Sequence, residues 1–495
     1  MPIAAFATLG CKVNQYETQR ILDDFEAYGF QITEFNKPAD VYIINTCSVT
    51  QAAERKSRQL VRKLAATNPH ARVVMTGCYG EMAAIKGEII EEAHLIVPNS
   101  QKLKTLSHVL QSFPHLQMHT EELPGTPVPK YRRRTRANLK VQDGCNVFCT
   151  FCSIPFTRRI MASRPIEELL EEARVRATQG YREIVVTGVL VGAYGQDSLM
   201  QPGVPHQWRP GDEMLTPDLA DLLLRLAQVP GIERLRLSSV EPTQITDRLL
   251  QAFATEPKLC RHLHIPLQSG DNGVLAAMNR PYTREFYLER CMTARKLMPD
   301  IAITADIMVG FPGEDDAAFS NTCSMVDEAG FARAHIFRYS PRQGTPAAEF
   351  VTQVPEAVKE LRSKELASAC AISQQRFIRQ FINASLQVLV EGKGAATGDS
   401  DGVSGNDGNV DDTSATSISG YNLLSGYTSN YIRVQFTGGS HLAGTLVTVH
   451  LTEQTSDGAL GEAGGAHFGP MEAPPDATFI PLAAFNGDLA ESHSR

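Results

Sequence analysis

The chain has 495 residues, of which 42% are hydrophobic and 21% are charged. This length is too great for a single hydrophobic core and predicts two to four domains of an ordinary globular protein. The formal net charge of −8 argues against a generally basic nucleic-acid binder, although a local basic patch stays compatible with it.

The amino terminus, Met1–Phe6, lacks the basic segment that opens a secretion signal. No apolar run approaches the ~18 residues that a membrane helix needs. We therefore expect a cytoplasmic protein with neither a signal peptide nor a membrane span. The ten cysteines do not make a disulfide scaffold in a chain of this length. Without a secretion signal, they indicate metal-binding or catalytic roles.

Residues 1–125 predict a first domain in which short apolar strands alternate with helices. The expected strands are Ile3–Thr8, Val41–Asn45 and Arg72–Thr76, and the expected helices are Tyr16–Tyr28 and Ala52–Ala66. This βαβα order is typical of a parallel sheet covered by helices.

One cysteine follows each of these strands. Cys11 comes after the first strand, Cys47 after the second and Cys78 after the third. Since ligands bind beyond the carboxyl ends of the strands in open α/β sheets, we expect a three-thiol site assembled from three loops. The alternative is that each cysteine is a small buried hydrophobic residue. The equivalent positions of all three favour the metal site.

A basic linker is expected at residues 126–137, after a proline-rich stretch. Lys130–Arg136 contains five cations and one tyrosine in seven residues. Such a run is suited to binding a phosphate backbone, and it is equally typical of a solvated linker. The sequence leaves both interpretations open.

The stretch Gly144–Cys152 carries the most specific motif of the chain. Cys145, Cys149 and Cys152 have the spacing C-x3-C-x2-C on a loop that follows a probable strand. Iron–sulfur clusters normally take four thiolates, so three leave one iron free for the amino and carboxylate groups of S-adenosylmethionine. This spacing is typical of radical S-adenosylmethionine enzymes. The alternative is a zinc knuckle, which usually needs four ligands.

Residues 138–375 predict a central domain of six strand–helix units. The expected strands are Asn138–Val141, Glu183–Thr187, Leu235–Ser239, His262–Leu267, Ile303–Val309 and Ala334–Tyr339. The helical patterns between them include Pro165–Thr178, Asp218–Gln228, Arg284–Leu297 and Asp315–Ala329. Six units predict an open (β/α)6 partial barrel, and chemistry in such folds takes place at the carboxyl ends of the strands.

Two histidines and four cysteines of this domain are expected to have structural roles. His262 and His264 alternate on one strand and share a face, where packing or hydrogen bonding is expected rather than a metal role. The remaining cysteines have no ligand spacing and are expected to be structural: Cys260, Cys291, Cys323 and Cys370.

After a long helix at Val358–Phe381, residues 382–452 predict a small β-rich domain. Its expected strands are Leu386–Glu391, Tyr431–Val434 and Thr445–Leu451. Tyr427 and Tyr431 suit either stacking on bases or half-buried packing. Residues 392–420 are rich in Gly, Ser, Thr and Asp and predict a disordered insertion. We expect residues 453–495 to form a mostly flexible tail, apart from the apolar Phe479–Phe485.

Three motifs resemble the amino-terminal domain of the methylthiotransferases: Leu9–Thr18, Ile44–Thr50 and Thr76–Cys78. With the cysteine loop, the chain is similar to the radical S-adenosylmethionine methylthiotransferase family through most of its length. The resemblance implies, in order, an N-terminal methylthiotransferase domain, a radical S-adenosylmethionine domain and a small RNA-binding TRAM domain. It also implies that the six cysteines bind two [4Fe–4S] clusters. Arg159 stands where the family commonly has a glycine, which puts the backbone path after Arg158 in question.

The resemblance extends to the polar and glycine-rich strand ends of the central domain. In the family these strand ends contact the cofactor, and glycines there allow close approach to adenine. The resemblance implies that S-adenosylmethionine contacts Thr187, Gly188, Ser238, Ser239, Glu241, Gln268, Gly310 and Pro312.

The resemblance implies a reaction as well. The cluster on Cys145, Cys149 and Cys152 is expected to cleave S-adenosylmethionine and generate a 5'-deoxyadenosyl radical, which removes hydrogen from C2 of adenine. The second cluster is expected to hold or supply the sulfur, and a second S-adenosylmethionine donates the methyl group. An electron donor protein such as flavodoxin or ferredoxin is also implied.

The motifs look closest to the branch that acts on N6-threonylcarbamoyladenosine at position 37 in the tRNA anticodon loop. The alternative within the family is the branch that acts on N6-isopentenyladenosine at the same position, and a third branch modifies a ribosomal-protein aspartate. A rival from another class is a non-enzymatic iron–sulfur regulator that binds RNA. Reductive cleavage of S-adenosylmethionine separates the enzyme from the regulator.

Overall fold

The computed structural model describes residues 1–48, 51–117, 135–200, 203–393 and 422–464. Most of the basic linker, nearly all of the expected insertion at 392–420 and the apolar segment Phe479–Phe485 therefore lie outside the described residues. Residues 1–463 form one compact unit.

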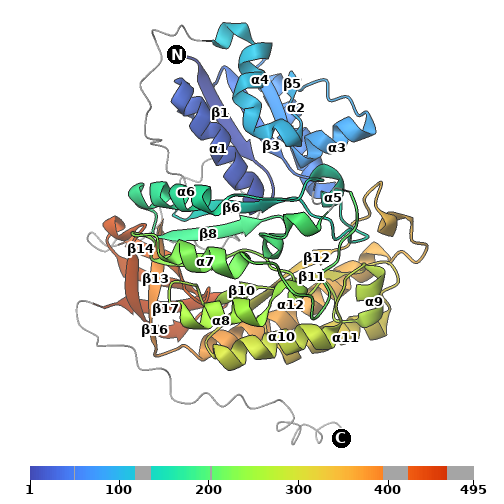
Figure 1. Ribbon diagram of the computed structural model, residues 1–495, viewed down its shortest axis with the longest axis vertical. Helices are drawn as coiled ribbons and strands as arrows, with labels where there is room; N and C mark the ends of the chain where they lie inside the picture. Colours follow the sequence, from blue (N-terminus) through green and yellow to red (C-terminus); the bar gives the residue numbers. More distant parts are fainter. Residues whose placement is uncertain (49–50, 118–134, 201–202, 394–421, 465–495) are drawn as a thin grey trace, which may run out of the picture. The chain divides into compact units, whose positions relative to one another are not determined.

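The N-terminal domain contains the predicted parallel sheet, which has five strands where the sequence predicts three. Its strand order is β2-β1-β3-β4-β5, and Figure 1 shows it in blue at the start of the chain. The strands are β1 (Ile3–Thr8), β2 (Gln31–Thr33), β3 (Val41–Thr46), β4 (Arg72–Gly77) and β5 (Leu95–Ile96). All six residues of β3 are buried, because helices cover both faces of the sheet.

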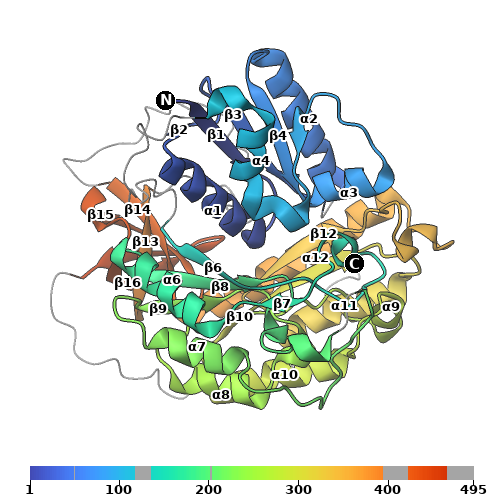
Figure 2. The same cartoon turned by 45° about the horizontal axis from the view of Figure 1, so that its top comes forward.

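Two helices cover each face of this sheet (Figure 2). Helices α1 (Lys12–Tyr28) and α4 (Thr105–Ser112) bury apolar side chains such as Phe25 against one face. Helices α2 (Gln51–Thr67) and α3 (Cys78–Lys86) bury residues such as Val61 against the other. Short 3-10 helices, η1 (Asn99–Lys104) and η2 (Pro114–Leu116), flank α4.

The central domain confirms the predicted open partial barrel of six parallel strands. These are β6 (Ala137–Asp143), β8 (Glu183–Gly188), β9 (Arg234–Leu237), β10 (His262–His264), β11 (Ala302–Val309) and β12 (Arg333–Arg338). They form two sheets, β6-β8-β9 and β10-β11-β12, and Val240 N donates to His264 O (3.0 Å) where the two adjoin. A short antiparallel strand, β7 (Ala162–Ser163), pairs with the outer edge of β6.

Helices follow the strands and enclose one apolar core. They are α6 (Ile166–Thr178), α7 (Leu219–Ala227), α8 (Asp247–Thr255), α9 (Asn272–Ala277), α10 (Arg284–Leu297), α11 (Asp316–Ala329) and α12 (Glu356–Arg379), with a short α5 (Ile154–Thr157) after the cysteine loop. Figure 2 shows α6, α7 and α8 on the outer side of β6, β8 and β9. Among the described helices, none has both the length and the apolar character needed to cross a bilayer.

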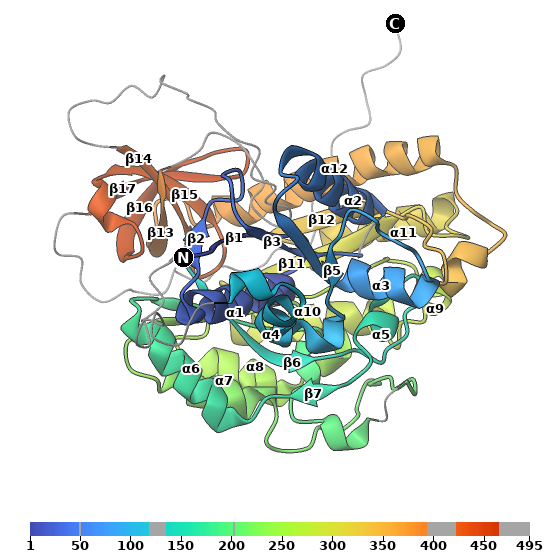
Figure 3. The same ribbon diagram turned by 90° about the horizontal axis from the view of Figure 1, so that it is seen from above.

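The small C-terminal domain is a closed five-stranded barrel (Figure 3). Its strands are β13 (Ser385–Lys393), β14 (Asn422–Thr428), β15 (Arg433–Gly438), β16 (Leu446–Gln454) and β17 (Gly458–Ala463). The expected end of the domain at residue 452 is wrong, because β17 pairs with both β15 and β16 and completes the barrel. Its sequence, Gly458–Ala463, is rich in small residues and lacks the alternating pattern from which a strand is recognised.

Candidate functional site

The cysteine loop begins directly after β6, at the carboxyl end of the first barrel strand. Gly144 has a φ of +80°, and a Cβ atom there would lie 2.1 Å from Ile160 O. Phe148, within the loop, also has a positive φ, of 55°. The loop is therefore tightly folded, and residue 144 must be a glycine for the chain to enter it.

The turn at the end of α9 holds this loop in place. Asn279 Nδ2 donates to Val147 O (3.2 Å) and to Phe148 O (2.9 Å). Thr150 donates from its backbone N to Met278 O (3.1 Å) and from Oγ1 to Ala277 O (2.9 Å). These bonds fix the backbone that carries Cys145, Cys149 and Cys152.

The three thiols of the loop lie close enough to affect one another's ionisation. Burial, together with the neighbouring Cys149 and Cys152, raises the pKa of Cys145 well above its usual value. Arg280 Nη1 donates to Cys149 Sγ (3.2 Å). Thiolates crowded together in this way need positive charge, which iron supplies by coordinating them in deprotonated form. The donor set fits an iron–sulfur cluster.

The second group of thiols lies at one edge of the N-terminal sheet. Strands β1, β3 and β4 are neighbours, and Thr46 pairs with Gly77 at their carboxyl ends. Cys11 immediately precedes α1, Cys47 follows β3, and Cys78 is the first residue of α3. A Cβ atom on Gly10 would lie 2.5 Å from Cys47 Sγ, so the loop that carries Cys11 lies against Cys47.

Buried ion pairs connect the N-terminal domain with the cysteine loop. Glu17, on α1, accepts hydrogen bonds from Lys102 Nζ (2.6 Å), Lys140 Nζ (2.6 Å) and Arg158 Nη2 (2.8 Å). Burial would raise the pKa of Glu17, but these three cations hold it well below its usual value. Lys140 is on β6, and Figure 1 shows this strand beside α1.

Within this network, Arg158 bonds to a residue close in the chain to each group of thiols. Its Nη1 donates to Asp143 Oδ1 (2.8 Å), just before the cysteine loop, and its Nη2 donates to Asn14 Oδ1 (3.1 Å), three residues after Cys11. Its positive charge also acts on Cys11 and is affected by Cys78. The next residue, Arg159, is exposed and has no left-handed backbone, so the departure from the family's glycine creates no strain.

Four of the expected cofactor contacts lie at the ends of β8 and β9. Thr187 and Gly188 end β8, where a Cβ on Gly188 would lie 3.1 Å from Gln142 Oε1. Ser238 follows β9 and its buried Oγ has no hydrogen-bond partner among the described residues, whereas Ser239 is exposed. The buried amide of Gln244 also has no partner. Such orphaned polar atoms fit a site that hydrogen-bonds a nucleoside.

Glu241 and three later residues complete the expected set. Glu241 forms an ion pair with Arg280. Gln268 has a positive φ of 63° and forms an isolated bridge with Ile307, and Pro312 is buried. A Cβ on Gly310 would lie 2.3 Å from Lys359 Cγ. Packing against Lys359 therefore explains the glycine at 310, independently of any ligand.

Arg136, the described cation of the basic linker, is half-buried and engaged within the protein. It pairs with Glu183 (3.3 Å) and Glu391 (2.8 Å) and lies over the ring of Tyr427 at 5.0 Å. These contacts engage Arg136 inside the protein, and phosphate binding by the basic run stays a prediction. Arg132, Arg133 and Arg134 lie outside the described residues.

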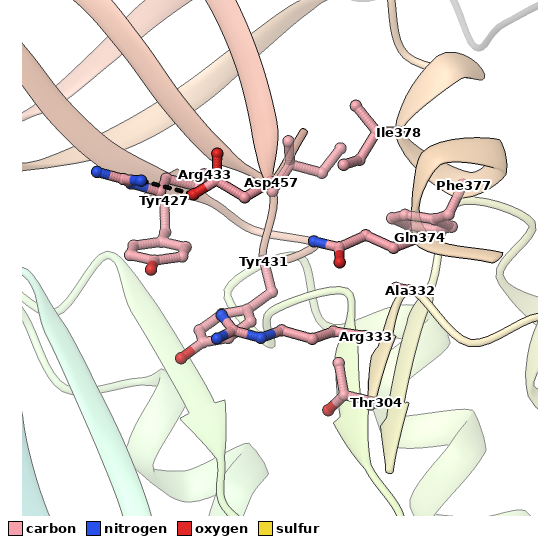
Figure 4. Close-up of a pocket in the computed structure, with 11 residues that line it drawn as sticks. Thr304, Ala332, Arg333, Gln374, Phe377, Ile378, Tyr427, Tyr431, Arg433 and Asp457 are labelled. Carbon is pink, nitrogen blue, oxygen red and sulfur yellow. Dashed lines mark hydrogen bonds and ion pairs between the residues drawn. The ribbon is translucent and has the colours of Figure 1, made fainter. Parts of the chain in front are cut away.

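Tyr427 and Tyr431 are half-buried and pack against other rings. Their rings stack at 4.9 Å, and Tyr431 also stacks on His262 at 4.6 Å. Both line a cavity of about 10 Å³, and Figure 4 shows Tyr431 beside Arg333 in it. A cavity of that volume has room for about one water molecule, and the half-buried, stacked rings agree with the packing interpretation.

His262 and His264 make hydrogen bonds, as the sequence predicts. His262 Nε2 and His264 Nδ1 each share a hydrogen bond with Thr304 Oγ1, at 2.9 and 2.8 Å. The four cysteines outside the two trios lie within the protein: Cys260, Cys291 and Cys370 are buried and Cys323 is half-buried.

Sequence reasoning assigned no role to the residues that organise the two groups of thiols. Asn279 and Arg280 act on a loop about 130 residues earlier in the chain, and no local pattern reveals such a contact. Glu17, by contrast, has a local signal. It falls on the apolar side of its helix, with Val13 and Ile21 four residues away on either side, and this position indicates a buried charge.

Two family descriptions match this chain. Residues 4–97 match the Uncharacterized protein family UPF0004, and residues 139–326 match the Radical SAM superfamily. The second match implies a [4Fe–4S] cluster and S-adenosylmethionine, which fit the cysteine loop described above.

Named relatives cover most of the chain. The threonylcarbamoyladenosine tRNA methylthiotransferase MtaB of Bacillus subtilis is 36% identical over 91% of this chain and 94% of that relative. The protein of the same name from Thermotoga maritima is 34% identical over 79% and 87%. The tRNA-2-methylthio-N(6)-dimethylallyladenosine synthase of Geobacillus thermodenitrificans is 31% identical over 90% and 80%. Together with the cysteine loop and the open partial barrel, these similarities show that the chain belongs to the radical S-adenosylmethionine methylthiotransferase family.

Proposed function

We propose that this protein adds a methylthio group to C2 of N6-threonylcarbamoyladenosine at position 37 of tRNA. The observation that carries the proposal is the placement of two sets of three cysteines in one compact unit: one set follows β6, and the other follows three neighbouring strands. Replacing hydrogen by sulfur at an unactivated carbon needs one site that breaks the C–H bond and another that delivers the sulfur. Cys145, Cys149 and Cys152 are the residues for the first task, and Cys11, Cys47 and Cys78 are the residues for the second.

The first site contains groups suited to a cluster and a nucleoside cofactor. A reduced [4Fe–4S] cluster with S-adenosylmethionine supplies the one-electron chemistry that opens the C–H bond. Arg280 donates to Cys149 Sγ, and hydrogen bonds to ligating sulfurs tune a cluster's potential. Ser238 and Gln244 offer buried polar atoms without partners for hydroxyl groups of the nucleoside. Thr187 and Gly188 offer backbone groups at the end of β8.

Two cations lie near the cysteines that we propose as ligands of a second [4Fe–4S] cluster. The charges of Arg158 and Lys102 both interact with Cys78. Positive charge beside a set of thiolates stabilises the negative charge that three of them bring. A second cluster on Cys11, Cys47 and Cys78 would therefore lie in a favourable field.

The choice of substrate rests on the relatives. The proteins named threonylcarbamoyladenosine tRNA methylthiotransferase reach 36% identity, and the dimethylallyladenosine synthases reach 34%. The first group covers more of this chain at its highest identity, which favours the threonylcarbamoyl branch. We further propose that the protein acts in the cytoplasm, that the small β-barrel contributes to tRNA binding, and that flavodoxin or ferredoxin donates the electrons.

Nucleoside analysis of tRNA from a deletion strain tests this function. We expect 2-methylthio-N6-threonylcarbamoyladenosine to disappear and its precursor, N6-threonylcarbamoyladenosine, to accumulate. Wild-type protein and the Cys323→Ala variant should restore the product, because Cys323 belongs to neither group of thiols. Cys145→Ala and Cys47→Ala should not restore it. Persistence of the product in the deletion strain would contradict the proposal, and loss of 2-methylthio-N6-isopentenyladenosine instead would assign the protein to the other branch.

A further inference from the structure

A cavity of about 260 Å³ lies between the N-terminal and central domains. Nine of the described residues line it: Glu54, Arg55, Arg58, Met82, Lys86, Glu88, Ser153, Arg342 and Gln343. Four of these are cations and two are carboxylates, which leaves an excess of two positive charges. Met82 is the one apolar side chain in the lining.

The elements that carry these residues start at the two groups of thiols. Helix α3 begins at Cys78, and α2 begins four residues after Cys47. Ser153 follows Cys152 directly, and Arg342 Nη1 donates to Ser153 Oγ (3.3 Å). Ser153 is the chain neighbour of Cys152 and Met82 lies one helical turn after Cys78, so the cavity borders a segment from each group of thiols.

The cations of the cavity converge on one region. Burial raises the pKa of Glu54, and Lys86, Arg342 and Arg58 each oppose that rise, so all three lie within electrostatic range of one carboxylate. Arg58 is already engaged, because it donates to Tyr79 OH (3.3 Å) and pairs with Glu88 (3.6 Å). Arg55 and Lys86 are exposed and have no ion-pair partner in the described part of the chain.

We propose that this cavity, here called the carboxylate pocket, binds the carboxylate of the threonylcarbamoyl group through Arg55 and Lys86, with Arg342 beside them. The inference rests on the proposed function and names the residues that select its substrate. In adenine only N1 separates C2 from C6, the atom that bears N6. A substituent on N6 therefore stays close to the carbon that reacts, and the pocket borders a segment from each group of thiols.

The chemistry of the pocket distinguishes the two candidate substrates. The threonylcarbamoyl group ends in a carboxylate and a hydroxyl, which cations and polar side chains bind with charge-assisted hydrogen bonds. The isopentenyl group is a hydrocarbon, and it gains stability only where apolar side chains bury it. A pocket with four cations and one apolar side chain favours the carboxylate.

Binding of anticodon stem–loop RNAs to the full-length protein tests the pocket. Three synthetic stem–loops carry adenosine, N6-threonylcarbamoyladenosine or the methyl ester of the latter at position 37. The ester lacks the negative charge and differs otherwise only by one added methyl group. We expect wild-type protein to prefer the acid to the ester by roughly tenfold, in line with one charge-assisted hydrogen bond. We expect Arg55→Gln combined with Lys86→Gln to abolish this preference and leave binding of unmodified adenosine unchanged.

Two controls accompany the double variant. Lys63→Gln removes an exposed cation from α2 that does not line the pocket, and it should keep the preference. Arg55→Lys with Lys86→Arg retains both charges and should keep it as well. Thermal melts of all variants should coincide with wild type, since the substituted side chains are exposed.

Three results would overturn the proposal. Equal binding of acid and ester by wild-type protein would mean that no group recognises the carboxylate. A preference that survives in the double variant would place recognition elsewhere. An equal loss of affinity for all three RNAs, with a weaker salt dependence, would mean that the cations contact phosphates instead. None of these affects the nucleoside analysis, which tests the proposed function independently.

Discussion

At the scale of single residues, Gly10 determines whether the loop with Cys11 can lie against Cys47. Its φ is +94°, a conformation that side chains disfavour by roughly 1–2 kcal/mol, and a Cβ atom would lie 2.5 Å from Cys47 Sγ. The glycine thus satisfies a backbone requirement and a close approach at once. Any larger residue must displace the thiol of Cys47.

Substituting Gly10 with alanine should empty the N-terminal cluster site and spare the other. We expect the iron content of the Gly10→Ala variant to fall from about eight to about four atoms per chain, if each site holds one [4Fe–4S] cluster. Iron and labile-sulfide analysis of anaerobically reconstituted protein measures this. Gly87→Ala is the matched control, because Gly87 also has a positive φ, +67°, but nothing lies within 4 Å of its Cβ position. Full iron content in the Gly10 variant would contradict the assignment.

The sequence was sufficient to predict the cysteines of the two groups, but it did not predict the side chains that surround them. Cys145, Cys149 and Cys152 are neighbours in the chain, so their spacing alone indicates a cluster. Arg280 reaches Cys149 from a turn in another β/α unit, and only the fold brings them together. The same holds for Arg136, which looked like part of an exposed basic run and instead pairs with Glu183.

At the scale of secondary structure elements, burial explains which strands were predicted. Strands β8 and β11 are mostly buried apolar runs, whereas β9, β10 and β12 mix apolar residues with arginine or histidine. Both patterns can be recognised in the sequence. The missed strands β2, β5 and β7 have three residues or fewer. Strand β17 is longer, but Gly458 and Gly461 interrupt its pattern. Short or glycine-rich strands depend on partners that the sequence does not reveal.

Strands β8 and β9 attach the small barrel through one buried carboxylate. Arg236, on β9, donates to Thr428 O (3.1 Å) and Ser429 O (3.0 Å) of the small barrel, and its Nε donates to Glu183 Oε1 (2.8 Å). Burial would raise the pKa of Glu183, but Arg236 and Arg136 lower it to about 2. Glu183 therefore neutralises the arginines that hold the two domains together.

The Glu183→Gln variant should lose stability in a pH-dependent way. An unfolded glutamate has a pKa of about 4.3, so the lowered value in the folded protein contributes up to about 3 kcal/mol above that pH. This contribution is lost as the pH falls through about 4 towards 2. Urea unfolding should thus show a large difference between wild type and variant at pH 7 and a smaller one at pH 3. Glu233→Gln, whose glutamate pairs with Arg182 near the surface, should behave like wild type, and a pH-independent difference for Glu183→Gln would contradict this account.

At the scale of the whole molecule, Glu17 joins the domain with one group of thiols to the domain with the other. Its partners Lys140 and Arg158 belong to the central domain, and Lys102 belongs to its own. In the proposed reaction both groups of thiols serve the same adenosine, so their relative position has to be fixed. A buried charged network suits this purpose, because its geometry is more specific than that of apolar contacts.

This argument predicts strong coupling between Glu17 and Arg158. Removing one partner of a buried ion pair costs roughly 3–5 kcal/mol, because the other charge is left without compensation. We therefore expect Glu17→Gln and Arg158→Gln each to destabilise the protein by about this amount. The double variant should cost less than the sum, with a coupling energy of roughly 1–3 kcal/mol in urea unfolding. Glu34→Gln, which removes an exposed surface pair with Lys37, is the matched control and should change little.

Hydrogen exchange distinguishes positioning of the domains from a purely local contribution. If the network fixes the two domains, Glu17→Gln should increase exchange in α1 and in β6 together, although β6 carries no substitution. Stability losses confined to α1, or additive effects in the double variant, would contradict the role of this network. The comparison works without either cluster, so it tests the protein's own contribution to the spacing of the two sites.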